Sequence, residues 1–459
     1  MCTRYSRVQI VGLAALLGAA LALASIYYSF RMMGSLGANL VEFIGMNFLA
    51  GAIFVCAVYL VEHYRCGHWG LGIILGGALL FRLLLLPMWP SLSQDLYRYR
   101  WQGRAQQEGL NPYTVTPATP SLEHLRDETY QLMGTKDLLS VYPPLTEQLF
   151  AWIFRLTPSV VGFKSLFVMF DLASVVVLLL LLKTRRLPLE RVIIYAWNPL
   201  VITSFAASGH YDSVAIFTLL LALLFMVGRK PMLSTGLLAF STLTKFFSIL
   251  LFPALLKRVF ESRQRADTIS GRIFWFWHGA KYAVFFALLI GLPFLLYAPV
   301  GTGTIFEGLD HFVNNYENND SLFRIIRFCG NSHMQAQLVA GVFVIALLIR
   351  ALKKWADPLK IALLMTAAIV LFSPNSFPWY FTWSIPFLCF YPNSPGLLMS
   401  ITATLGYAPL VEYNALGSYN DSQLFLWLEY GPVFALGAGL LFLRQIMPGR
   451  DLSLHSKAG

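Results

Sequence analysis

Apolar runs long enough to cross a lipid bilayer recur along the whole sequence. A helix needs about 20 mostly apolar residues to span the hydrocarbon layer. Hydrophobic residues make up 57% of the 459 positions and charged residues 12%, whereas a soluble domain carries about 25% charged residues. The sequence therefore predicts an all-α polytopic membrane protein, one transmembrane domain over residues 1–459 with about 12–14 transmembrane helices. The expected spans are 8–28, 38–61, 69–90, 160–182, 190–208, 213–228, 276–298, 335–352, 359–376, 378–392, 395–411 and 423–443.

Lysine and arginine predict which loops face the cytoplasm, because such loops are enriched in basic residues. The first apolar run follows Arg4 and Arg7 and lacks a small-residue cleavage site, so we expect a retained helix with a cytoplasmic amino terminus. Basic clusters then fall on the cytoplasmic side at 63–65, 183–186, 353–354 and 444–450. The formal charge of +11 is thus attributed to loop anchoring, or to a basic pocket for anionic lipid, rather than to nucleic-acid binding.

The segment 232–256 has basic residues at both flanks, at 229–230 and from 257 to 281. If both flanks are cytoplasmic, the segment must turn back within the membrane. We therefore expect a hairpin of two short helices with Lys245 near its tip. Lys245 could neutralise Asp171 inside the bundle, or it could bind the phosphate of a lipid carrier.

The five cysteines show neither CxxC pairs nor the spacing of metal ligands. They predict no disulfide framework and no metal site.

The long polar stretch 91–158 is expected outside the cytoplasm and ordered, since loops of this length are usually functional and this one is rich in Trp, Tyr and Leu. Its start predicts a helix over 94–107, capped by Ser93, that places Asp95, Arg98, Tyr99 and Gln102 on one face. Asp95 could be a cap that pairs with Arg98. Alternatively, it could be a general base for an acceptor hydroxyl while Arg98 or Arg100 holds a phosphate.

Other outward segments also carry polar residues that allow two interpretations. His210 and Asp212 lie at a junction between two spans, where such residues act as helix caps or as ligands. The asparagine-rich run 314–320, followed by Arg324, suits sugar hydroxyl groups but also ordinary turns.

The order of several motifs resembles a known superfamily. These motifs are SQDLYRYRWQGRAQQEGLNPY, VYPPLTEQLFAW, WNPLVITSFAASGHYD, LTKFFSILLFPALL and SPNSFPWYFTW. Together, over roughly residues 80–390, they resemble the GT-C superfamily of polyprenyl-phosphate-sugar-dependent glycosyltransferases. The likeness is to bacterial mannosyltransferase-like members and, more distantly, to the GPI mannosyltransferase that adds the first mannose.

The resemblance implies an inverting hexosyltransferase, with mannose as the expected sugar, that acts on the non-cytoplasmic face. Its acidic loop motif maps onto Asp95, which we expect to be the catalytic base. Many members carry two acidic residues there, whereas this chain has Gln94-Asp95, which argues against a tight metal site while a divalent cation stays an open alternative. The residues expected to bind substrate are Arg98, Arg100, His210, Asp212, Lys245 and Arg324.

The expected partners are a polyprenyl-phosphate-sugar donor, a lipid, glycan or protein acceptor, and membrane lipids, with no nucleic acid. The expected location is the bacterial inner membrane, with the endoplasmic reticulum as the alternative. A lipid-linked sugar flippase or transporter is the main competing function, but we find none of the paired halves typical of transporters. A second alternative, an O-antigen polymerase or ligase, usually carries its large loop late in the chain, whereas here it lies early.

Overall fold

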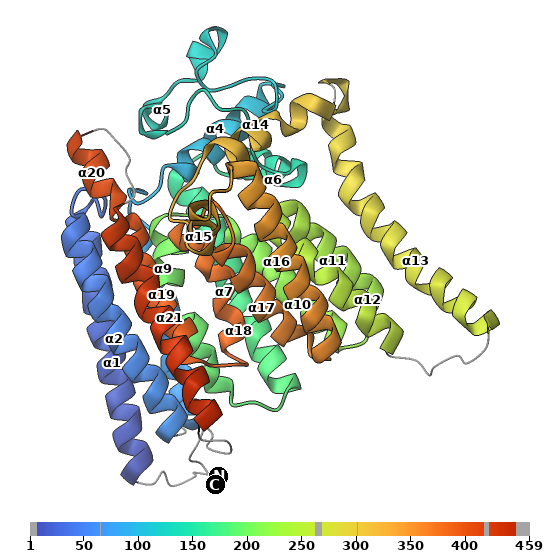
Figure 1. The fold of residues 1–459 in the computed structure, drawn as a ribbon. Coiled ribbons are helices and arrows are strands. Elements are labelled where there is room, and N and C mark those ends of the chain that lie inside the picture. Colours follow the sequence, from blue (N-terminus) through green and yellow to red (C-terminus); the bar gives the residue numbers. More distant parts are fainter. Residues whose placement is uncertain (1–6, 65, 262–268, 301, 417–421, 447–459) are drawn as a thin grey trace. The chain divides into compact units, whose positions relative to one another are not determined.

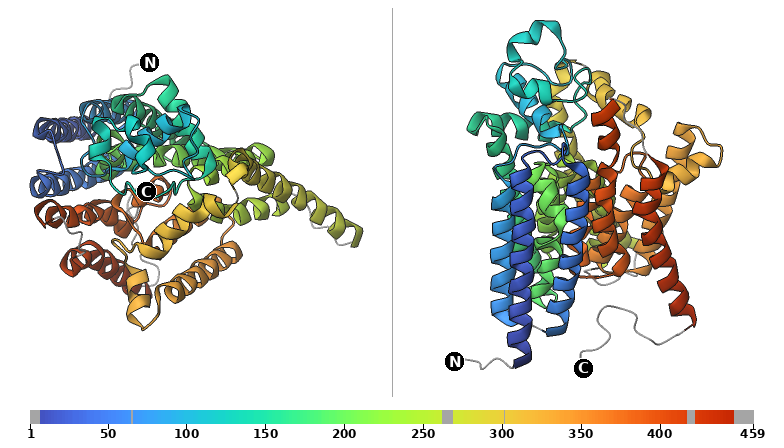
Figure 2. Two further views of the ribbon diagram at one scale, coloured as in Figure 1. Left: turned by 90° about the horizontal axis from the view of Figure 1, so that it is seen from above. Right: turned by 90° about the vertical axis from the view of Figure 1, so that its left-hand side faces the viewer.

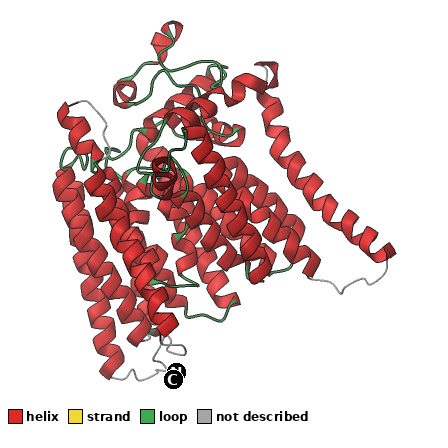
Figure 3. Ribbon diagram, in the orientation of Figure 1, coloured by secondary structure: helices red, strands yellow, loops and turns green. Residues whose placement is uncertain are grey.

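A computed structural model describes residues 7–64, 66–261, 269–300, 302–416 and 422–446. Within these ranges the chain consists of helices and loops and has no strand (Figure 3). An isolated bridge joins Asn318 and Asn375. The predicted all-α membrane fold is confirmed.

The chain divides into two compact units. Unit 1 comprises Met1–Leu92, Leu178–Gly209 and Ser376–Gly459, and unit 2 comprises Ser93–Val177 and His210–Asn375. Helix α7 (Val160–Thr184) passes from unit 2 into unit 1 (Figure 1).

The helices of unit 1 include three long ones that lie side by side, α1, α2 and α3 (Figure 2). The elements of this unit are α1 (Arg7–Met33), α2 (Leu40–Tyr64), α3 (Gly67–Leu85), η2 (Leu189–Val192), α8 (Ile193–Ala196), α9 (Pro199–Ile202), η3 (Thr203–Ala207), η6 (Pro378–Trp383), α18 (Ile385–Leu388), α19 (Ser394–Thr402), η7 (Ala403–Tyr407), α20 (Pro409–Leu416) and α21 (Gln423–Ile446). Arg82 is fully buried in α3 and donates to the carbonyls of Ala78 (3.0 Å) and Ala196 (2.7 Å). Backbone carbonyls thus solvate this intramembrane cation.

Unit 2 contains residues 93–158 of the polar loop and the predicted hairpin. Its elements are α4 (Asp95–Gln107), η1 (Pro120–Leu125), α5 (Glu128–Leu132), α6 (Pro144–Leu156), α10 (Asp212–Val227), α11 (Pro231–Thr244), η4 (Phe246–Leu251), α12 (Phe252–Glu261), α13 (Ile269–Gly291), η5 (Leu292–Val300), α14 (Thr302–Asn315), α15 (Leu322–Phe328), α16 (His333–Lys354) and α17 (Pro358–Leu371). Figure 1 shows α4, α5 and α6 together at one end of α10, α11 and α12.

Seven helical segments in the described ranges are long and apolar enough to cross a membrane. They are Arg7–Met33, Leu40–Tyr64, Gly67–Leu85, Val160–Thr184, Trp277–Tyr297, His333–Lys354 and Gln423–Leu443, with Asp212–Val227 and Pro358–Leu371 as shorter apolar helices. These agree with nine of the expected spans. The chain is therefore an integral, multi-pass membrane protein.

Three expected spans, 190–208, 378–392 and 395–411, are broken into short helical pieces, so their prediction as continuous helices was wrong. In the first, Asn198 accepts a hydrogen bond from the backbone N–H of Leu200 (3.1 Å), and Pro199 begins a new helix. Proline lacks the N–H that would continue the previous helix. Pro386 and Pro409 likewise lie at the starts of short helices in the other two segments.

The segment 232–256 forms the expected hairpin. Helix α11 ends at Thr244, and Lys245 follows it in an extended conformation. The chain then continues into η4 and α12, both of which pack against α11. Lys245 therefore lies at the point where the chain reverses.

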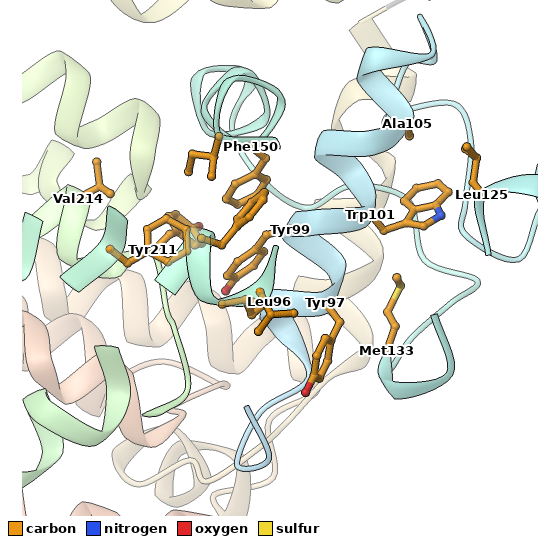
Figure 4. Packing of buried hydrophobic residues seen from close by; sticks show 14 of the residues in the cluster. Leu96, Tyr97, Tyr99, Trp101, Ala105, Leu125, Met133, Phe150, Tyr211 and Val214 are labelled. Atoms are coloured by element: carbon orange, nitrogen blue, oxygen red, sulfur yellow. The ribbon is translucent and has the colours of Figure 1, made fainter. Parts of the chain in front are cut away.

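Helices α4 and α6 pack closely around an aromatic cluster in unit 2 (Figure 4). Tyr99 stacks on Phe150 with ring centroids 4.6 Å apart and meets Tyr211 edge-on at 5.2 Å. This contact ties the start of the polar loop to the residue that precedes α10, and thus fixes the position of Asp95 relative to Asp212.

Gly103 allows the close approach of α4 to α6. A Cβ atom at this position would lie 2.5 Å from the carbonyl oxygen of Phe150 and 2.9 Å from the Cβ of Phe154. We expect Gly103→Ala to destabilise the protein by about 1–3 kcal/mol, as overpacking of a tight contact does. Thermal unfolding in detergent measures this effect. Gly341→Ala in α16, where nothing lies within 4 Å, is the matched control and should leave the melting temperature unchanged; equal shifts in both variants would contradict the expectation.

Candidate functional site

Asp95 opens α4 and thereby faces the start of α10. The residue before it, Gln94, is the N-cap, whereas Ser93 was expected there. Ser93 instead accepts a hydrogen bond from the backbone N–H of Asp95 (3.3 Å). A carboxylate in the first turn is stabilised by the helix dipole, so the local sequence explains why an aspartate is tolerated here.

Asp95 has two polar neighbours and remains accessible. His210 Nδ1 lies 3.6 Å from Asp95 Oδ2, and the Tyr99 hydroxyl donates to the same oxygen (3.4 Å). The side chain of His210 is fully buried, whereas 39% of the Asp95 side chain is exposed. The carboxylate is therefore held by its neighbours yet can receive a ligand.

A buried ion pair lies next to these residues. Lys245 Nζ is 3.2 Å from Asp212 Oδ1, and the Asp212 side chain is fully buried. The same ammonium lies 4.6 Å from the centroid of the Tyr211 ring, a cation–π contact. At the tip of the hairpin, Lys245 thus pairs with Asp212, a partner that the sequence analysis did not propose for it.

The surroundings change the proton affinity of Asp95. Protein atoms crowd the carboxyl group and restrict its hydration, which raises its pKa, and the charge of Asp212 raises it further; Lys245 lowers it. Burial, and next the charge of Lys245, lower the pKa of His210 well below its usual value, so its imidazole is neutral at neutral pH. The site therefore combines an accessible carboxylate of increased basicity with a neutral histidine and a fixed cation.

Arg98 and Arg100 have partners other than Asp95. Arg98 donates to the carbonyls of Thr135 (2.8 Å), Leu139 (3.1 Å) and Leu138. Arg100 forms an ion pair with Asp127 (2.6 Å). Both arginines fasten the polar loop to α4.

Arg324 belongs to a second polar cluster of unit 2. Its Nη2 lies 2.7 Å from Asp320 Oδ1, and Asn318 Nδ2 donates to Asn375 Oδ1 (2.8 Å). The structure thus brings together Asp95, His210, Asp212 and Lys245, while Arg98, Arg100 and Arg324 pair with other groups.

Glu147 is a buried acid that the sequence analysis did not single out. Ser140 Oγ donates to one of its oxygens and Gln106 Nε2 to the other (3.0 Å). Burial raises the pKa of Glu147 to about 8, although the Ser140 hydrogen bond and the charge of Arg98 oppose this shift. The motif around it, VYPPLTEQLFAW, gave no local sign that this glutamate would be buried, because its partners Ser140 and Gln106 lie 7 and 41 positions earlier in the chain.

The raised pKa of Glu147 predicts how stability depends on pH. An unfolded glutamate titrates near about 4.3, so between that pH and about 8 the folded protein keeps a proton that the unfolded chain has lost. Stability should therefore fall with rising pH in this window, by up to about 1.4 kcal/mol per pH unit. Glu147→Gln, which cannot ionise, should reduce this decline when melting temperatures are measured in detergent from pH 5 to pH 8. Glu108→Gln, at an exposed position, should not; an unchanged slope in Glu147→Gln would contradict the assignment.

Among the residues that the structure describes, no three His, Cys, Asp or Glu side chains are grouped so that they could hold a metal ion.

Two family models match the chain. Residues 7–260 match the model described as "Alpha-(1->6)-mannopyranosyltransferase, N-terminal domain" of the MptA_B family, and residues 303–418 match the "MptB C-terminal domain". No curated protein matches the chain. The first match covers more than half of the sequence, including Asp95, His210, Asp212 and Lys245, and it confirms the resemblance to bacterial mannosyltransferases of the GT-C type. The chain therefore belongs to the MptA_B family of mannosyltransferases.

Proposed function

We propose that this membrane protein transfers mannose from a polyprenyl-phosphate carrier to a hydroxyl acceptor on the non-cytoplasmic face, with inversion at the anomeric carbon. The observation that carries the proposal is the accessible carboxylate of Asp95 near the Lys245–Asp212 ion pair. Family membership supports mannosyl transfer over the flippase or transporter alternative. In this proposal the sugar donor and the acceptor are both substrates, and both bind beside the carboxylate of Asp95.

The proposed reaction is a single displacement. The acceptor hydroxyl gives its proton to Asp95 as its oxygen forms a bond with the anomeric carbon. The bond from that carbon to the phosphate oxygen breaks, and its electron pair leaves with the phosphate. Lys245 stabilises the growing negative charge, as a fixed cation does best in a poorly hydrated site.

The remaining residues have supporting roles in this proposal. Asp212 orients Lys245, and the neutral His210 contacts a hydroxyl group of the sugar or the acceptor. Arg98 and Arg100 position α4 and the loop that follows it, through Thr135 and Asp127. Arg324, paired with Asp320 in the second polar cluster, is the proposed contact for the lipid phosphate or the acceptor there. No metal is needed for this step, since Asp95 takes the proton of the acceptor and Lys245 balances the charge that grows on the phosphate.

The name of the family model supports a proposal for the linkage. The matching model is named for alpha-(1->6)-mannopyranosyl transfer, so we propose the 6-hydroxyl of a mannose residue as the acceptor group. An inverting enzyme that forms an alpha linkage must start from a beta-linked donor. The proposed donor is therefore beta-mannosyl phosphate on a polyprenyl chain.

The proposed topology places residues 91–158, as the catalytic loop of one transmembrane domain, outside the cytoplasm of a bacterial inner membrane. Cysteine labelling in a background without the native cysteines tests it. Glu108→Cys, at the end of α4, should react with an impermeant maleimide in intact cells, and Arg186→Cys should react only after lysis; both positions are exposed. The reverse pattern would contradict the topology.

Purified protein in lipid nanodiscs tests the reaction. We expect transfer from polyprenyl-phosphate beta-mannose to a mannoside acceptor, and none from GDP-mannose in the absence of lipid carrier. The anomeric carbon–hydrogen coupling in the NMR spectrum of the product should indicate an alpha linkage. Transfer from the nucleotide sugar, or a beta-linked product, would contradict the proposal.

A further inference from the structure

A cavity of about 250 Å³ lies in unit 2 among α10, α11, α12 and α13. Its polar lining consists of Arg229, Arg258, His278 and Tyr282. Its apolar lining consists of Met226, Pro231, Leu255 and Val259. The lining of the cavity is thus half polar, with two arginines, and half apolar.

The polar lining suits an anion. Two guanidinium groups supply fork-shaped donors that match phosphate oxygens, and the imidazole and the phenol add further hydrogen-bonding groups. None of the described residues that line the cavity is acidic. The described lining therefore supplies no carboxylate to neutralise the two arginines.

The cavity is distinct from the candidate functional site. Asp212 begins α10, whereas Met226 lies in its last turn and Arg229 just beyond its end. A helix of 16 residues is about 24 Å long. The cavity and the Lys245–Asp212 pair therefore lie at opposite ends of α10.

The sequence beside the cavity is typical of a membrane interface. Trp277 precedes His278 on α13, and tryptophan is enriched where hydrocarbon meets the headgroups. Beyond the cavity, Val284 and Leu288 leave more than half of their surface exposed on α13. An acyl chain can pass along this apolar face while its headgroup occupies the cavity.

The size of the cavity limits the ligand. Pockets for complete small molecules occupy about 300–1,000 Å³, so this cavity suits a phosphate with a short glycerol stem rather than a whole glycolipid headgroup. We infer that it binds the phosphate headgroup of an anionic phospholipid, held by Arg229 and Arg258, with Leu255 and Val259 against the start of the acyl chains. Basic cavities between transmembrane helices bind anionic headgroups in this way.

Native mass spectrometry of the purified protein with added phosphatidylglycerol tests the inference. The double variant Arg229→Gln/Arg258→Gln should bind this lipid at least about tenfold more weakly, because each lost charge-assisted hydrogen bond costs about a factor of ten. The control Lys183→Gln/Arg186→Gln removes the same charge from exposed positions at the end of α7 and just beyond it and should bind as the wild type does. Should the double variant not fold, His278→Leu is expected to weaken binding about threefold.

Three outcomes would overturn the inference. Equal losses in the control and in the double variant would indicate attraction by net charge alone. Equal binding of phosphatidylcholine would remove the need for an anionic headgroup. Displacement of the lipid by inorganic phosphate would assign the cavity to free phosphate.

Discussion

Asp95→Asn is expected to lower kcat for mannosyl transfer by about 10³-fold, within the 10²–10⁴ range of general acid–base catalysis. The asparagine keeps the size of the side chain but cannot accept the proton of the acceptor hydroxyl. The Tyr99 hydroxyl can still donate to the amide oxygen at the position of Oδ2, so the local structure should persist. Initial rates with polyprenyl-phosphate beta-mannose measure the effect.

Glu108→Gln is the matched control, because it removes a carboxylate from the exposed end of the same helix. Its kcat and the melting temperatures of both variants should equal those of the wild type. If Asp95→Asn transferred mannose at the wild-type rate, Asp95 would not be the base. If Asp95→Asn lost both its activity and its cooperative melting transition, the role of Asp95 would be structural.

Lys245→Gln is expected to lower kcat by about 10²-fold, the lower end of what one preorganised electrostatic contact contributes. The neutral side chain cannot stabilise the departing phosphate, and it leaves the buried carboxylate of Asp212 without the cation 3.2 Å away. The loss should appear in kcat more than in KM, because the phosphate gains charge in the transition state. Steady-state kinetics over a range of donor concentrations separate the two.

Lys245→Arg should recover part of this activity, since it restores the positive charge. Lys136→Gln is the control; that lysine lies in the polar loop 91–158, 5.0 Å from the centroid of the Tyr130 ring, and its loss should leave kcat unchanged. Equal activity of Lys245→Gln and wild type would contradict a role in phosphate departure.

Features that depend on neighbouring residues could be predicted from the sequence. The helix that starts at Asp95 follows from the residues around it, and the basic flanks of 232–256 were sufficient to predict a hairpin with Lys245 at its tip. The long apolar spans were predicted for the same reason, because the length and the hydropathy of each span can be read from its own residues.

Features that depend on distant partners could not be predicted. The pairing of Lys245 with Asp212 and the approach of His210 to Asp95 join segments far apart in the sequence. Arg98 was expected beside Asp95 because of helical spacing, but it turns to the carbonyls of residues 135–139. Hydropathy likewise does not reveal that Asn198 and Pro199 interrupt an apolar segment.

The central claim is that the ionised carboxylate of Asp95 accepts the proton of the acceptor. Its raised pKa places the acid limb of kcat/KM above the usual aspartate value, about 3.9, because activity is lost as pH falls through that pKa. Asp212 raises this pKa and Lys245 lowers it.

The decisive measurement is the pH–rate profile of the wild type, Asp212→Asn and Lys245→Gln. The account predicts that the acid limb moves to lower pH in Asp212→Asn and to higher pH in Lys245→Gln. An acid limb that stays fixed in both variants, or shifts in the same direction in both, would contradict it.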